Sequence, residues 1–88
     1  MDKKHFSPLD KKEEQQFLNA LGKKIKQLRV EKDWSQERLG FKSNLDRTYI
    51  GGIERGERNL TVLNLKKIAD ALGTPVSDIL AEKSNDKE

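Results

Sequence analysis

Hydrophobic residues recur at three- and four-residue spacing along most of this chain, which is the period of one face of an α-helix. The first such stripe predicts a helix over about Gln15 to Lys32, with apolar positions at Phe17, Leu18, Leu21, Ile25 and Leu28. Another predicts a helix between a Thr61 cap and Gly73, with apolar positions at Leu65, Ile68, Ala69 and Leu72. No stretch alternates apolar and polar residues over a useful length, so we expect no strand and an all-α fold.

Between these two stripes, residues 35–56 predict two short helices joined by a tight turn. Ser35 is a suitable N-cap for the first helix, and Asn44 tolerates the left-handed conformation that ends it. Asp46 is a second N-cap candidate, and the following helix is expected to end near Arg55, before Gly56. This order is that of a helix-turn-helix unit, whose second helix can enter the major groove of DNA.

This stretch resembles the Xre-type (phage-repressor-like) family of DNA-binding domains. The resemblance is carried by the opening Ser-Gln, the closing Ile-Glu-Arg-Gly, and apolar or small residues at Leu39, Gly40, Leu45, Ile50 and Ile53. It continues through LKKIADALG and PVSDIL, and thus covers about Leu18 to Leu80. Within the family, SNLDRTYI and RNLT are most similar to the small controller proteins of restriction–modification systems. The resemblance implies a compact five-helix domain with the helix-turn-helix at its second and third helices, and a dimeric transcription regulator acting at its own promoter.

Length, composition and charge narrow the class of protein. Eighty-eight residues without cysteine suit one small domain in a reducing cytoplasm, and the net charge of +3 permits binding to nucleic acid. We expect a flexible arm over 1–14, the DNA-binding domain over 15–81 and a polar tail over 82–88. There is no apolar run of membrane-spanning length, and the only histidine, His5, lies in the arm. We therefore expect no enzyme, metal site, cofactor or membrane association. No small-molecule effector is evident from the sequence.

Base contacts are expected from the exposed, N-terminal part of the second helix of the unit. Arg47 can donate two hydrogen bonds to guanine, and Thr48 can meet a base edge or a thymine methyl. The resemblance supports this Arg-Thr pair. Asp46 is primarily a cap and only secondarily a partner for cytosine. Gly51 and Gly52 are also placed here, and three explanations stay open: close approach of the backbone to DNA, specificity carried by Arg47, Thr48 and DNA shape, or weak DNA binding.

Phosphate contacts are expected from residues on the flanks of this helix. The candidates are Gln36, Arg38, Tyr49, Arg55, Arg58, Asn59 and Thr61. Gln36 and Thr61 each open a helix, whose N-terminus favours anions. A competing interpretation of Tyr49 is a partly buried packing role. A competing interpretation of Arg38 is a solvated surface position.

Two further assignments follow from the resemblance. It implies an ion pair between Arg29 and Glu54, which would lock the first helix to the recognition helix. It also implies a homodimer that binds palindromic half-sites of an operator in double-stranded DNA, with Val76, Ile79 and Leu80 as the candidate interface. The alternative for these three residues is that they only close the core of the monomer.

A second class of function stays open from the sequence. The same helical domain could hold a partner protein, as in an antitoxin or a phage-type repressor. A neighbouring methyltransferase or endonuclease gene would support the controller, and a toxin gene would support the antitoxin.

Overall fold

The computed structural model describes residues 10–82 and contains five α-helices. They are α1 (Lys11–Glu31), α2 (Gln36–Ser43), α3 (Arg47–Glu54), α4 (Val62–Leu72) and α5 (Val76–Leu80). No strand occurs within the described part of the chain. The all-α, five-helix architecture expected from the sequence is confirmed. No helix between residues 10 and 82 is long and apolar enough to span a membrane.

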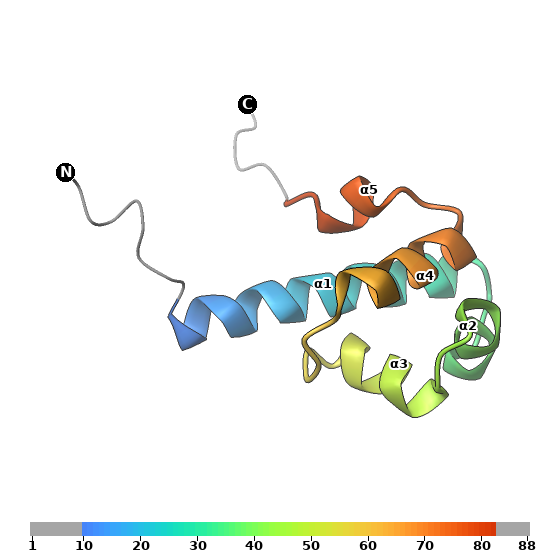
Figure 1. Cartoon of the computed structure of the whole chain (residues 1–88), viewed down its shortest axis with the longest axis horizontal. Coiled ribbons are helices and arrows are strands. Elements are labelled where there is room, and N and C mark those ends of the chain that lie inside the picture. Colours follow the sequence, from blue (N-terminus) through green and yellow to red (C-terminus); the bar gives the residue numbers. More distant parts are fainter. Residues whose placement is uncertain (1–9, 83–88) are drawn as a thin grey trace.

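Helix α1 is the spine of the domain (Figure 1). Helix α3 packs on α1, α2 packs on both α3 and α4, and α5 packs on α1 and α4. In Figure 1, α2 and α3 lie on one side of α1 and α4, and α5 lies on the other. The first turns of α1 extend beyond the other helices. The helix-turn-helix pair and α5 are thus presented on different sides of the same small core.

The core is formed by one apolar face from each of the five helices. Its buried members are Leu21, Ile25, Leu39, Ile50, Ile53, Leu65, Ile68, Ala69, Leu72 and Ile79. Burying an aliphatic side chain of this size stabilises the fold by about 1.5–3 kcal/mol relative to exposure. The spacing of apolar residues therefore predicted the core well. Phe17, at the start of the first predicted stripe, differs: its side chain is 37% exposed.

The first helix begins earlier than the sequence predicted, at Lys11 instead of Gln15. The backbone N–H of Glu13 donates to Asp10 Oδ1 at 2.7 Å, and the N–H of Asp10 donates to Glu13 Oε1 at 3.1 Å. This capping box satisfies orphan donors of the first turn, so polar residues 11–14 become helical. The rest of the predicted arm, residues 1–9 with His5, lies outside the described residues, as do 83–88 of the predicted tail.

The predicted helix boundaries around the turn are confirmed. The side chains of Ser35, Asp46 and Thr61 each accept a backbone N–H of the helix that follows. Asn44 ends α2 in the left-handed conformation at φ 61°. Helix α3 ends at Glu54, one residue before the predicted limit.

Gly22 lies where α1 crosses the end of α3. A Cβ added at Gly22 would stand 2.7 Å from the backbone oxygen of Glu54 and would also collide with the carbonyl of Ile53. Backbone atoms at such a crossing cannot move aside, so only glycine permits this separation of the two helices. The crossing explains a glycine that otherwise weakens the middle of α1.

Candidate nucleic-acid interface

The outer face of α3 carries the residues predicted to read DNA bases. Ile50 and Ile53 point into the core, so with 3.6 residues per turn Thr48 and Gly52 face away from it. The carboxylate of Asp46 accepts the N–H of Thr48 at 2.7 Å, which confirms its role as a cap. The side chains of Arg47 and Thr48 are exposed on the first turn of the helix. They are therefore free to meet a ligand.

Gly51 and Gly52 are buried, although neither belongs to the apolar core. Long polar side chains cover them. A Cβ added at Gly51 would lie 3.1 Å from Arg55 Nη1 and 3.3 Å from Gln36 Oε1, and one added at Gly52 would lie 3.0 Å from Arg58 Cγ. The space beside the two glycines is thus occupied by side chains from α2 and from the segment after α3.

A buried polar network holds α3 in place. Arg29 donates to the carboxylate of Glu54 through Nε at 2.7 Å and Nη2 at 2.9 Å, and its Nη1 donates to the carbonyl of Trp34 at 2.6 Å. The ion pair predicted from the family resemblance is present. Hydrogen bonding to Glu54 raises the pKa of Arg29 against the opposing effect of desolvation, with a further increase from the charge of Glu54. The arginine stays charged, and α1 is fixed to the end of α3.

Gln36 belongs to the same network. Its Nε2 donates to Glu54 Oε1 at 3.0 Å, so one of its amide donors is already engaged. The sequence predicted Gln36 as a phosphate contact and gave no signal of this bond. The amide carries two N–H donors, and the second one remains available to a ligand.

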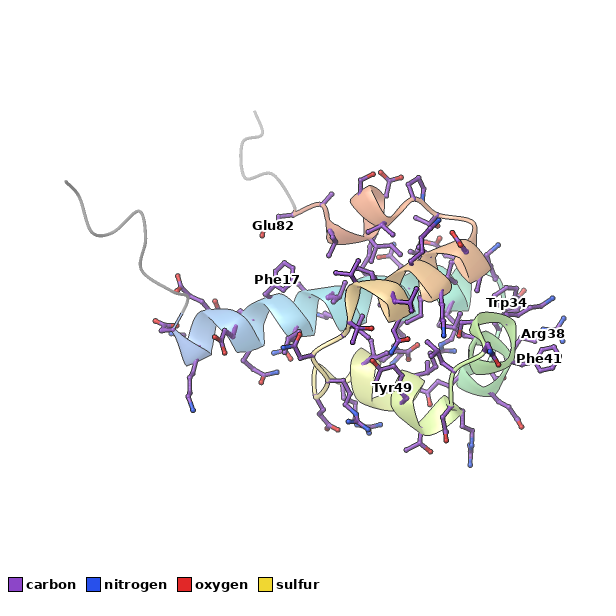
Figure 2. The ribbon with its side chains drawn as sticks, viewed as in Figure 1. Phe17, Trp34, Arg38, Phe41, Tyr49 and Glu82 are labelled. Carbon is purple, nitrogen blue, oxygen red and sulfur yellow. The ribbon has the colours of Figure 1, made fainter. Side chains whose placement is uncertain are left out.

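Tyr49 lies half-buried on the flank of α3 (Figure 2). Its hydroxyl oxygen accepts a hydrogen bond from Asn64 Nδ2 at 3.1 Å, and the guanidinium carbon of Arg58 stands 5.3 Å from the centre of its ring. Asn64 was not predicted as a site residue, because in the sequence it is one more polar position on an amphipathic helix. Through Asn64 the first turn of α4 is tied to α3.

The remaining predicted phosphate contacts, Arg38, Arg55, Arg58, Asn59 and Thr61, are all exposed. Arg55 forms a surface ion pair with Glu57 at 3.0 Å, and hydrogen bonding to that carboxylate raises the pKa of Arg55. Asn59 is exposed in the loop before Thr61. Arg38 lies apart from these residues, since Figure 2 shows it beside Phe41 on the outer side of α2.

A second tie, which the sequence did not indicate, fixes the end of α3 to α1. Gln15 Nε2 donates to the carbonyl of Gly56 at 2.8 Å and to Asn19 Oδ1 at 2.9 Å. Gly56 has φ +77°, and its Cα sits so close to Asn19 that a side chain there would collide. The turn after α3 is thereby held against α1, which fixes the direction of the backbone leading to Arg58.

The α5 side presents the candidate dimer surface. Ile79 is only 3% exposed and lies in the core of the monomer, so the structure corrects its assignment as an interface residue. Val76 also packs partly against the core. Leu80 is 39% exposed and lines a groove between α5 and α1 together with Phe17, whose ring points to the α5 side of α1 in Figure 2. Leu80 and Phe17 therefore supply the apolar surface here.

Within residues 10–82 no cluster of three or more histidine, cysteine or acidic side chains could hold a metal ion. The buried polar side chains of the same region all have hydrogen-bond partners.

Comparison with known proteins agrees with this geometry. The helix-turn-helix family HTH_3 matches residues 25–79. Control protein C.BamHI of Bacillus amyloliquefaciens is 48% identical over 60 residues, covering 67% of this chain and 74% of that protein. The immunity repressor of Bacillus phage phi105 is 40% identical over 69 residues, covering 78% of this chain and 48% of that protein.

Solved structures give the same result. The restriction–modification controller protein C.AhdI of Aeromonas hydrophila is similar with a TM-score of 0.69 at 44% identity, covering 70% of this chain and 94% of that one. The hypothetical transcription factor NHTF of Neisseria is similar with a TM-score of 0.71 at 39% identity, covering 76% of this chain and 75% of that one. The chain belongs to the Xre-type helix-turn-helix family, among relatives that include restriction–modification control proteins, and it is a DNA-binding transcription regulator and not an enzyme.

Proposed function

We propose that this protein is the controller of a restriction–modification operon, and that it acts as a cytoplasmic homodimer at an operator near its own promoter. The observation that carries the proposal is the first turn of α3, where Arg47 and Thr48 stand exposed on a helix fixed by the Arg29–Glu54 pair. Similarity to several control proteins of such systems supports the choice of target genes.

In this proposal Arg47 reads guanine through its planar fork, and Thr48 reads the neighbouring base pair. The backbone of the DNA is held on both flanks, by the free amide donor of Gln36 and by Asn59 and Thr61 before α4. Both are helix N-termini, where N–H groups and the helix dipole favour phosphate. A single domain of this size contacts few base pairs, so tight and specific binding requires two copies on two half-sites.

Selection from a random duplex library at about physiological salt tests the proposal. The purified protein should enrich a palindromic motif whose half-sites lie about one helical turn, or 34 Å, apart. A motif without a palindrome would remove the dimer from the proposal. Failure to enrich any sequence, with binding that vanishes as salt rises, would leave only electrostatic attraction. A partner protein would then become the principal ligand.

The similarity to a phage immunity repressor favours one alternative, a repressor of phage genes that uses the same DNA-reading face. The two functions differ in the genes controlled and not in the chemistry of α3. A search for the selected motif in the genome that encodes this protein distinguishes the two functions. A controller's motif lies upstream of its own gene, beside a methyltransferase or endonuclease gene.

A further inference from the structure

We propose that Gly52 is a positioning residue, which seats the side chain of Arg58 on the reading face of α3 so that Arg58 reads a base edge beside Thr48. This inference rests on the DNA reading proposed for α3, and it assigns to Gly52 a role different from either explanation given by the sequence. Helix α3 carries glycine at positions where a larger side chain would face DNA. Its missing side chains are replaced from outside the helix.

The position of Gly52 is the first observation. It lies four residues after Thr48 and therefore on the same outward face, one turn further along. A residue facing away from the core is expected to be exposed, yet Gly52 is buried. The atoms nearest to a Cβ built there all belong to Arg58: Cγ at 3.0 Å, Nε at 3.5 Å and Cδ at 3.7 Å. The stem of Arg58 occupies the space that a side chain at 52 would fill.

The direction of Arg58 is the second observation. From Gly52 its guanidinium reaches the ring of Tyr49, three residues toward the start of α3, with 5.3 Å between its central carbon and the ring centre. This separation is within the range of a cation–π contact, which holds the planar group and leaves its N–H edges free to donate. The ring is itself oriented by Asn64, which donates to its hydroxyl. Arg58 is thus directed to the N-terminal half of the helix, the part that enters the groove.

Arg58 and its neighbour Arg55 differ in their ion pairing. Arg55 is paired with Glu57, whereas no carboxylate within residues 10–82 forms a salt bridge with Arg58. Arg58 is nevertheless exposed as a whole residue, since only its stem covers the glycine. The guanidinium group of Arg58 is therefore available to the two acceptors of guanine. Its aliphatic stem is already held against Gly52 in the protein without DNA. Ordering a long side chain in advance lowers the entropy lost on binding.

The test compares Gly52→Ala, Arg58→Ala, Arg58→Lys and the double variant Gly52→Ala/Arg58→Ala with the wild type. The quantity measured is sequence preference, the ratio of Kd for a shuffled duplex to Kd for the duplex selected by the wild-type protein. Lys66→Ala serves as the control, because it removes one exposed cation on α4 whose ion-pair partner is Asp70 and which contacts neither Gly52 nor Tyr49 in the bonds described above.

We expect Arg58→Ala to lower the preference at least about fivefold, and Arg58→Lys to lower it equally, since an ammonium cannot reproduce the fork. Gly52→Ala should lower it by about threefold or more, because its Cβ displaces the stem of Arg58, while thermal unfolding moves to a higher temperature through the gain in helix propensity. The double variant should match Arg58→Ala alone.

Each contrary result has a definite meaning. Additive losses in the double variant would show that Gly52 contacts DNA by itself, and an unchanged preference in Gly52→Ala would show that the seat is not needed. An unchanged sequence preference in Arg58→Lys would show that Arg58 contacts a phosphate and not a base. Any of these results, with a clear motif from the wild type, overturns this inference only. No motif from the wild type would overturn the proposed function and this inference together.

Discussion

Arg29 and Glu54 meet through two parallel hydrogen bonds, although 25 residues separate them in the sequence. The Glu54 side chain is 2% exposed and that of Arg29 is 10% exposed, so the pair is nearly dry. Charge-assisted bidentate pairs of this kind are short and directional. Helix α3 is consequently oriented by a buried ion pair at its last residue as well as by the apolar core.

Replacing Arg29 with alanine should lower the free energy of unfolding by about 3–5 kcal/mol, because the buried carboxylate of Glu54 loses its partner. Urea unfolding followed by circular dichroism measures the loss. Lys66→Ala is the matched control, since Lys66 pairs with Asp70 on the surface of α4. An exposed pair contributes about 0–1 kcal/mol. Equal effects of the two substitutions would contradict the structural role of the buried pair.

Gly22→Ala should destabilise the protein although alanine is the better helix former. The added Cβ would press on the backbone of α3 at the carbonyl of Glu54, and α1 would have to move away from α3. We expect a loss of about 1–3 kcal/mol in the free energy of unfolding, as for other overpacked sites. The same substitution at Gly52 meets only a flexible arginine, so it provides a control of opposite sign. Stabilisation of Gly22→Ala in a thermal melt would refute the close crossing.

Arg47→Ala should leave folding intact and lower affinity for the selected duplex by about 1–3 kcal/mol, with little change for shuffled DNA. The residue is exposed and carries no core contact, which makes the two effects separable. Fluorescence anisotropy with both duplexes measures them. Equal losses on both would reassign Arg47 to a phosphate.

Asp10→Ala should unravel the first turn of α1 and destabilise the protein by about 0.5–2 kcal/mol, the usual range for an N-cap. Backbone chemical shifts of residues 11–14 report the fraying directly. Asp10→Asn keeps a good cap and is the control. Unchanged shifts in Asp10→Ala would show that the early start of α1 does not depend on the capping box.

Leu80→Asp should convert the proposed dimer to a monomer without unfolding it, because Leu80 is 39% exposed and contributes apolar surface beside Phe17. Sedimentation velocity distinguishes the two states. Val30→Asp is the matched control, since Val30 is 52% exposed on α1 and does not line this groove. A dimer that persists in Leu80→Asp would place the interface elsewhere.

Helix existence and the core were readable from local information. The three- and four-residue spacing of Leu65, Ile68 and Leu72 marks a face whatever it packs against. Caps such as Ser35 and Asp46 act on backbone groups a few residues away, so their chemistry is also local. The capping box at Asp10 depends on the same local chemistry. Its sequence signature, Asp10 followed three residues later by Glu13, was not recognised because the residues around it are polar and show no apolar face.

The sequence by itself determined the first four helical segments, the turn between α2 and α3, and the exposed Arg47 and Thr48, because each depends on periodicity or on bonds between near neighbours. Only the tertiary structure decided that Ile79 closes the core, that Gln36 binds Glu54, and that Arg58 covers Gly52. These contacts join segments whose distance and angle are set by the packing of all five helices. No local pattern records such a crossing, and the side chains that meet there become visible only in three dimensions.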